Sequence, residues 1–474
     1  MLPAELPYNG KSREDILRHA RLLIGKRLAD LYPKTVFTGA SGKGGFGNHV
    51  EKYHFKYEPN SVSEPDFPDA GVELKTSPLR KSRRGHWKSK ERLVLGLINY
   101  DGIVKEIFEN SAFLKKNHHL LIIFYEHDGG ASLPNLMVHL VGDWRYPDND
   151  LAIIEKDWAT IQSKVLAGRA HLLSEGDTVY LGASTKGSNA KSLRNQPFSD
   201  VKAMQRAFAL KSRYVNFIIE NFESGERPSG QTSPIFATDE KKRLATVGFD
   251  NLVVSRFDRY VGKSPRAIAN ANSLTINFQA KSAYANLTKG VLIGQLDAEI
   301  EEFRKAGITV RTIRIDYEGT PREAVSFPAF EYIELVKEEW EDSNLMADCA
   351  KLFIVVYQCA NRIFDDKKLR LKGAFFWNTP VEDLEHARET WGKTREVINN
   401  GAIVSSVSGS RRRTNFPGAK GNPVVHVRPH GTTTADVYPL PVPDLVTGAF
   451  EYTKHSFWLN QKYLRRVIAE SLPD

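Results

Sequence analysis

Apolar residues recur along the chain at two spacings, and these spacings predict helices and strands that follow one another. A spacing of three to four residues predicts helices over 15–31, 158–168 and 201–222. Runs rich in β-branched and aromatic residues predict strands over 72–76, 119–125 and 177–181. Ser12 precedes the first helical pattern and is followed by Glu14 and Asp15, which together are typical of the start of a helix. The pattern is typical of a mixed α/β protein.

A polar segment rich in Gly, Pro and Ser interrupts this pattern after residue 222, and the pattern then resumes. Beyond the interruption a helix is predicted over 296–307, and strands over 308–315 and 351–357. A chain of 474 residues is also too long for one ordinary hydrophobic core. We therefore expect two domains, 1–222 and 250–474, joined by a linker over 223–249.

The two halves share an apolar frame, as the same kinds of residue recur in the same order. Four pairs of segments align: 43–51 with 281–289, 65–76 with 301–312, 118–125 with 350–357, and 207–219 with 456–468. Four matches in one order favour an internal duplication over chance. The charged cluster is not repeated, because Glu51, Asp66, Glu73 and Lys75 align with Lys289, Glu302, Thr309 and Arg311. If the first cluster is catalytic, the second half is expected to lack that chemistry.

Composition indicates a polyanionic partner and an ordinary reducing compartment. The net charge is +9 and the pI about 9.2, which favours nucleic acid as the partner. Two cysteines are too few for a disulfide framework, so a cytoplasmic location is expected. The first residues lack the layout of a signal peptide, and no apolar run reaches the roughly 20 residues of a membrane span. No membrane partner is expected.

The charged stretch EPDFPDAGVELKTSP, residues 64–78, has the residue types that phosphodiester hydrolysis requires. Strand alternation places Glu73 and Lys75 on one face, and a bend over 68–71 can return Asp66 to the side of Glu73. Asp66 and Glu73 could then hold Mg²⁺ beside a lysine that assists the attacking water, and Glu51 could join from a preceding helix. The ordinary alternative is an amphipathic strand with solvated charges. The combined spacing, and the loss of these charges in the second half, favour catalysis.

This stretch resembles a known family. Pro65-Asp66 followed by Glu73-Leu74-Lys75 matches the core of the PD-(D/E)xK nucleases. The longer string DFPDAGVELKTSP resembles the mismatch-repair nicking endonuclease MutH and the GATC-cutting type II restriction endonucleases related to it. The segment from Lys43 to Glu51 is similar to that family's upstream helix. The chain length and the duplication favour the two-lobed restriction enzymes over single-lobed MutH.

The resemblance implies an α/β fold with two tandem restriction-endonuclease-like lobes, each a mixed sheet flanked by helices. It implies that Asp66, Glu73 and Lys75 form a Mg²⁺-dependent catalytic core, with Glu51 assisting. The substrate would be double-stranded DNA at GATC, cut before the G to leave 5′ overhangs. The second lobe would bind DNA without cutting it and could be allosteric. A cognate DNA methyltransferase would belong to the same restriction–modification system.

Basic and polar groups near the cluster, and in the matching part of the second half, are candidates for DNA contact. They lie in the Lys/Arg-rich run over 80–92, in the loop over 184–197 and in the segment over 424–441. Solvated surface loops are the alternative for each segment. The candidates are Lys43, Arg80, Lys81, Arg83, Arg84, Lys88, Lys186, Lys191, Arg194, Gln196, Lys211, Arg428 and His430.

Two other functions remain open from the sequence. One is a strand-nicking mismatch-repair endonuclease like MutH, and the other is a DNA-binding regulatory protein without catalysis. The second is disfavoured because both carboxylates and the lysine are intact in the first half. With one active site per chain, double-strand cleavage is expected to need a homodimer on DNA.

Overall fold

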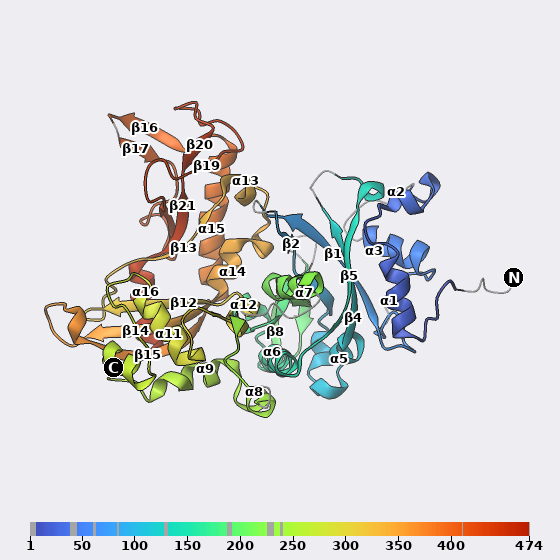
Figure 1. Cartoon of the computed structure of the whole chain (residues 1–474), viewed down its shortest axis with the longest axis horizontal. Helices are drawn as coiled ribbons and strands as arrows, with labels where there is room; N and C mark the ends of the chain where they lie inside the picture. The colour runs from blue at the N-terminus through green and yellow to red at the C-terminus, as the bar shows by residue number, and fades with distance from the viewer. Residues whose placement is uncertain are drawn as a thin grey trace.

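The structure is a computed structural model of the chain, and it consists of two lobes that lie side by side (Figure 1). Lobe one comprises the elements from α1 to α7, and lobe two those from α9 to α16. The structure describes residues 6–37, 45–59, 63–82, 85–127, 131–186, 192–224, 232–237, 240–409 and 411–473. Within these ranges no helix has the length and apolar character to cross a membrane.

The main sheet of lobe one has the strand order β2-β1-β4-β5. Its strands are β1 (Glu73–Lys81), β2 (Trp87–Ser89), β4 (His119–Glu126) and β5 (Val138–Arg145). β1 and β4 are parallel, and the other two pairs are antiparallel. Alternate residues of β4 face opposite cores: Leu121 and Ile123 join the core under α1 (Arg13–Arg21). Leu120 and Ile122 join the core under α6 (Asp148–Leu166) and α7 (Ser212–Ser224), so both faces of the sheet are covered (Figure 1).

A second, three-stranded sheet completes lobe one, with the order β3-β9-β6. Its strands are β3 (Leu93–Leu97), β6 (Leu181–Thr185) and β9 (Arg206–Leu210), and the hairpin β7 (Leu193–Gln196) and β8 (Ser199–Met204) lies beside them. The remaining elements of this lobe are α2 (Leu28–Leu31), η1 (Lys34–Phe37), α3 (Gly45–His49), η2 (Val50–His54), α4 (Tyr100–Ile103), η3 (Phe108–Asn110), α5 (Ala112–Asn117), η4 (Leu133–Asn135), η5 (Ala170–Leu172) and η6 (Glu175–Asp177).

Lobe two repeats this plan. Its main sheet is β12 (Thr309–Ile315), β14 (Lys351–Cys359) and β15 (Leu369–Asn378), and its second sheet is β13 (Val325–Phe330), β21 (His455–Leu459) and β18 (Val425–Pro429). In lobe one Glu73 pairs with Leu120, and in lobe two the aligned Thr309 pairs with the aligned Leu352. The two sheets therefore have the same register, as the alignment of the halves predicts. Both lobes also have a bulge at the aligned Tyr125 and Tyr357. Two tandem α/β lobes, as predicted, are therefore confirmed.

Lobe two and the segment before it contain the following further elements. They are β10 (Thr232–Ser233), α8 (Lys241–Val247), α9 (Phe249–Asp258), α10 (Pro265–Ala271), α11 (Ala283–Ile293), β11 (Glu299–Ile300), α12 (Glu301–Ala306), α13 (Tyr332–Leu335), η7 (Trp340–Asp342), α14 (Asn344–Ala350), η8 (Asp366–Lys368), α15 (Val381–Asn399), β16 (Val404–Ser408), β17 (Arg411–Thr414), β19 (Val437–Pro439), β20 (Glu451–Thr453) and α16 (Gln461–Ser471). Much of the expected linker is ordered, because Ile235 and Phe236 are buried and α8 packs on α6.

Four predicted elements differ from the structure. The helix predicted over 296–307 is formed only by α12, because residues 299–300 form strand β11 before it. The segment 201–222 holds strands β8 and β9 before helix α7, because its first half fills the centre of a sheet, where residues 206–210 are all buried. The helix predicted over 15–31 ends at Arg21, since the chain turns at Gly25 with φ 73° and pairs with β5. The strand predicted over 177–181 begins only at Leu181.

Candidate active site

A tight turn brings Asp66 back to the first residue of β1, as the sequence predicts. Gly71 has φ 65°, a left-handed conformation that suits glycine, and Phe67 bridges to Val72 across the turn. The Asp66 amide donates to Glu73 Oε2 at 3.1 Å, and the Leu74 amide donates to Asp66 Oδ2 at 2.9 Å. Backbone hydrogen bonds therefore hold the two carboxylates beside each other.

Two lysines from different elements approach the Glu73 carboxylate. Lys75 Nζ lies 2.5 Å from Glu73 Oε1 on the same face of β1, and Lys116 Nζ lies 3.6 Å from that oxygen. Glu73 itself is only 2% exposed. Lys116 belongs to α5, which leads directly into β4, and the parallel pairing of β4 with β1 places it here. The sequence interpretation missed Lys116, although a lysine one turn before the strand that pairs with β1 was a usable signal.

Glu51 completes the cluster from η2, a π-helical segment. Burial raises the pKa of Glu51 to about 7, with a further contribution from the Asp66 carboxylate. Burial likewise raises the pKa of Glu73 to about 7, and the Lys75 ammonium opposes that rise. The mutual effect of these acids shows that they gather in one poorly solvated place.

The carboxylate groups of the cluster are the kind of ligand that a hard divalent cation prefers. Asp66, Glu73 and Glu51 supply carboxylate oxygens, and repulsion between these acids is what a bound cation would relieve. Among the described residues no three His, Cys, Asp or Glu side chains stand close enough to form a complete metal cage. Mg²⁺ does not need one, because it is usually held by one or two carboxylates together with waters and substrate phosphates.

Six of the thirteen predicted DNA-contacting side chains are exposed. These are Lys81, Lys88, Lys186, Arg194, Arg428 and His430. The Arg194 guanidinium donates to Gln205 at 2.9 Å, and Arg428 lies over the ring of Trp458 at 4.9 Å. Lys43, Arg83, Arg84 and Lys191 lie outside the described residues.

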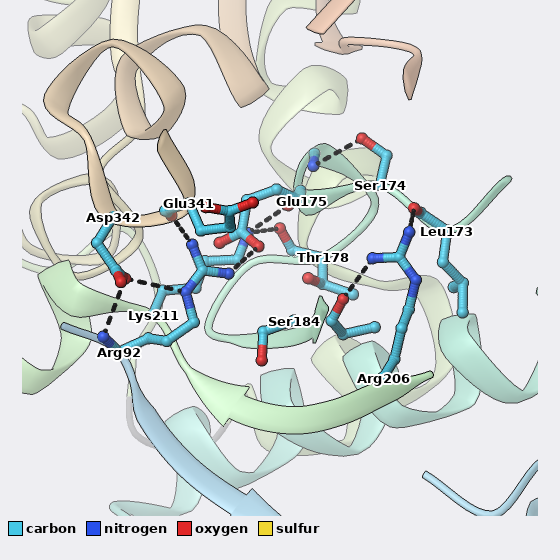
Figure 2. Close-up of polar contacts among 12 residues, drawn as sticks. Arg92, Leu173, Ser174, Glu175, Thr178, Ser184, Arg206, Lys211, Glu341 and Asp342 are labelled. Atoms are coloured by element: carbon cyan, nitrogen blue, oxygen red, sulfur yellow. Dashed lines mark hydrogen bonds and ion pairs between the residues drawn. The ribbon is translucent and has the colours of Figure 1, made fainter. Parts of the chain in front are cut away.

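Two of the predicted contacts are buried, and the structure gives them structural partners instead. Lys211 Nζ donates to the backbone carbonyls of Glu175 and Thr178 at 2.7 and 2.6 Å (Figure 2). The Gln196 side chain accepts from the Ala170 amide at 2.7 Å and donates to a neighbouring carbonyl. Neither side chain is presented to a DNA groove in this structure, because each satisfies buried backbone groups.

The half-buried Arg80 and the exposed Lys81 line a cavity of about 300 Å³ between the lobes, and Lys88 and Lys211 line it too. Arg80 lies 3.9 Å from Glu338 of lobe two, and Lys81 lies over the ring of Trp87. Nearby, Arg92 pairs with Glu175 of its own lobe and with Asp342 of lobe two (Figure 2). A basic wall from lobe one thus faces acidic residues of lobe two.

The aligned positions of lobe two have structural partners rather than a cluster of acids. Glu302 accepts the amides of Ile235 and Phe236, and Lys289 donates to two backbone carbonyls. Arg311 lies over the ring of Phe327 at 5.1 Å. The position of Lys116 is taken by Asp348, which pairs with Arg213 of lobe one. The frame is duplicated, but the cluster of Asp66, Glu73 and Lys75 is not.

Comparisons with known proteins agree with this architecture. The family MutH, described as DNA mismatch repair enzyme MutH, matches residues 55–157 and again residues 297–389. The type II restriction enzyme Sau3AI of Staphylococcus aureus is 32% identical over 97% of this chain and 99% of its own. The chain belongs to the MutH-related type II restriction endonucleases. DNA mismatch repair protein MutH of Shewanella woodyi is 25% identical over 40% of this chain and 80% of its own length. This chain is therefore about twice as long as that MutH protein.

Membership of this family makes the chain a nuclease that acts on DNA. The cluster of Asp66, Glu73 and Lys75 lies within the first of the two MutH matches. The second match covers the aligned positions, where Thr309 replaces Glu73 and the like-charged Glu302 and Arg311 replace Asp66 and Lys75.

Proposed function

We propose that this restriction endonuclease hydrolyses both strands of double-stranded DNA at GATC, before the G, and leaves 5′ overhangs. The proposal is supported by one observation above the others: the turn at Gly71 brings Asp66, Glu73 and Lys75 together in a poorly solvated site. The GATC target rests on the resemblance of DFPDAGVELKTSP to enzymes of that specificity.

The chain's own residues would divide the reaction between them. Asp66 and Glu73 would hold Mg²⁺, which when bound polarises the scissile phosphate and neutralises the departing oxygen. Lys75 would orient and help deprotonate the attacking water, and Lys116 would stabilise negative charge beside Glu73. Glu51, whose pKa is raised to about 7, would hold or release a proton at the edge of the site.

Lobe two would bind DNA without cutting it. Its exposed Arg428 and His430 lie on and just after β18, the strand that corresponds to β6 of lobe one. With one cluster per chain, two chains would assemble on DNA, and a cognate methyltransferase would protect the host sequence. The enzyme would act in the cytoplasm. We place the boundaries at 1–222 for the catalytic lobe, 223–249 for the connection and 250–474 for the DNA-binding lobe.

Digestion of supercoiled plasmid tests this function directly. Unmethylated and adenine- or cytosine-methylated plasmid are incubated with the chain in Mg²⁺ or in EDTA, and the ends of the products are sequenced. We expect linear fragments that begin with GATC in Mg²⁺ and intact plasmid in EDTA. Accumulation of open circles without linear product would instead support a MutH-like nickase, and ends at another sequence would refute the GATC assignment.

A further inference from the structure

The chain leaves η2 by an unusual route that returns it to the active-site cluster. The Phe55 amide donates to the Val50 carbonyl at 3.0 Å, which closes a wide π-type turn. Lys56 then adopts φ 63°, a left-handed conformation that is costly for a residue with a side chain. After it, the Tyr57 amide donates back to the Glu51 carbonyl at 3.1 Å. Backbone strain is thus used to bring Tyr57 beside Glu51.

The side chain of Tyr57 is fixed from the other side by the residue that follows Asp66. Its ring packs edge-on against Phe67, with the centroids 5.7 Å apart. The backbone of Tyr57 is thus held by the Glu51 carbonyl, and its ring is held by Phe67, the residue after Asp66.

The hydroxyl of Tyr57 is buried, and among the described residues it has no hydrogen-bond partner. Leaving a buried hydroxyl without a partner costs about 1–3 kcal/mol, so a water that also contacts nearby carboxylates is the natural partner. Burial raises the pKa of Tyr57, and the carboxylates of Asp66, Glu51 and Glu73 raise it further. The phenol therefore stays protonated and can act as a donor.

We propose that Tyr57 is a positioning residue: its hydroxyl donates to one ordered water that also hydrogen-bonds to Glu51 and Asp66, and this fixes the carboxylates in the orientation that binds the cation. The inference rests on the proposed metal-dependent cleavage and adds a residue outside the PD-(D/E)xK pattern. Partners that orient metal ligands typically change metal affinity or activity by about 10- to 100-fold when they are removed.

Tyr57→Phe removes the hydroxyl and leaves the ring against Phe67. We expect Mg²⁺ affinity, measured by calorimetric titration of the protein, to fall about tenfold. Cleavage should slow at low Mg²⁺ and recover when Mg²⁺ is raised. DNA binding in EDTA and the thermal unfolding midpoint should match those of the parent. Tyr53→Phe, the same change four residues earlier and within η2, is the control and should leave all four measurements unchanged.

The outcomes separate the inference from the function on which it rests. If the parent binds Mg²⁺ and Tyr57→Phe binds it equally well, the inference is overturned and the function stands. If Tyr57→Phe loses stability and DNA binding with unchanged Mg²⁺ affinity, its role is structural and the inference again fails. If the parent itself neither binds Mg²⁺ nor needs it to cleave, both are overturned.

Discussion

At the scale of single residues, the charge balance around Glu73 distinguishes the two lobes. Lys75 and Lys116 both approach Glu73 in lobe one, whereas Asp348 replaces Lys116 in lobe two and pairs with an arginine. A buried carboxylate with two ammonium groups nearby can stay ionised and still hold a cation. The exchange of a lysine for an aspartate would by itself disable such a site.

Lys116→Met keeps the length of the side chain and removes its charge. We expect cleavage of a GATC duplex to slow by about 10- to 100-fold with little change in DNA affinity, because the charge acts on the reacting site. Single-turnover cleavage and fluorescence anisotropy measure the two quantities. Lys115→Met, on the exposed side of α5, is the matched control. Equal rates for the two variants would remove Lys116 from the active site.

The buried His455 leads us to predict how the stability of the protein depends on pH. Burial lowers its pKa to about 4, and a hydrogen bond to the Thr453 carbonyl opposes that shift in part. The pKa of His455 in the folded protein lies below the unfolded value of about 6.5. Its full contribution to the free energy of unfolding is therefore present above pH 6.5 and is lost as the pH falls toward 4. The loss is about 3 kcal/mol at roughly 1.4 kcal/mol per pKa unit.

Denaturant unfolding at several pH values tests this prediction. His455→Gln should flatten the decline in the free energy of unfolding between pH 6.5 and 4, and His86→Gln, at an exposed position, should not. A variant curve that is parallel to the parent curve would contradict the assignment.

At the scale of elements, the carboxylate of Asp157 joins α6 to the start of β6. It accepts the amides of Val179, Tyr180 and Leu181 at 2.7, 2.7 and 2.8 Å, although burial raises its pKa to about 6. These bonds satisfy the amides of the two residues before β6 and of its first residue, Leu181. They explain why the predicted strand begins only at Leu181.

Asp157→Asn should lower the free energy of unfolding by about 2–4 kcal/mol, because one acceptor oxygen becomes a donor facing backbone amides. Denaturant unfolding at neutral pH measures the change. Asp101→Asn, which alters an exposed aspartate of α4, provides a control of the same chemistry. Equal stability of the two variants would show that the three bonds contribute little.

The sequence was informative where local spacing determines the geometry. The return of Asp66 to Glu73 follows from a turn within one short segment, and the repeated frame located β12 and β14. It was uninformative where distant segments meet. Lys211 has the charge of a DNA contact, but its burial depends on η6, and Lys116 joins the cluster only through strand pairing. Apolar periodicity could not separate β9 from a helix, because a fully buried strand has no polar face.

At the scale of the whole molecule, two lobes of one plan share an interface of charged residues. Lys305 of lobe two contacts Asp150 of lobe one at 2.9 Å, and Tyr214 donates to the same carboxylate. Because removing two charges from water is costly, a buried ion pair adds little to the stability of the interface between the lobes. Its main effect is to set the orientation of one lobe against the other. The lobes are thus joined through buried charged groups, and the proposed hydrolytic groups lie in one of them.

We predict that two chains assemble on one DNA site, because each chain has one proposed catalytic cluster. In Ca²⁺, used to suppress cleavage, sedimentation velocity with a GATC duplex should show two chains per complex. Double-strand cleavage by one chain in a single encounter, seen as a one-chain complex together with direct formation of linear plasmid, would contradict the prediction.

The central claim is that Glu73 of lobe one carries the chemistry, whereas the aligned position in lobe two is Thr309, which has no carboxylate. The most direct test compares Glu73→Gln with Glu302→Gln, the same change at the lobe-two position aligned with Asp66, on supercoiled plasmid in Mg²⁺, with DNA binding measured in parallel. We predict that Glu73→Gln binds DNA yet leaves the plasmid uncut, with cleavage reduced by at least about a thousandfold. Glu302→Gln should still produce linear fragments, even if the variant protein is less stable than the parent. Cleavage by Glu73→Gln at the parent rate would contradict the account.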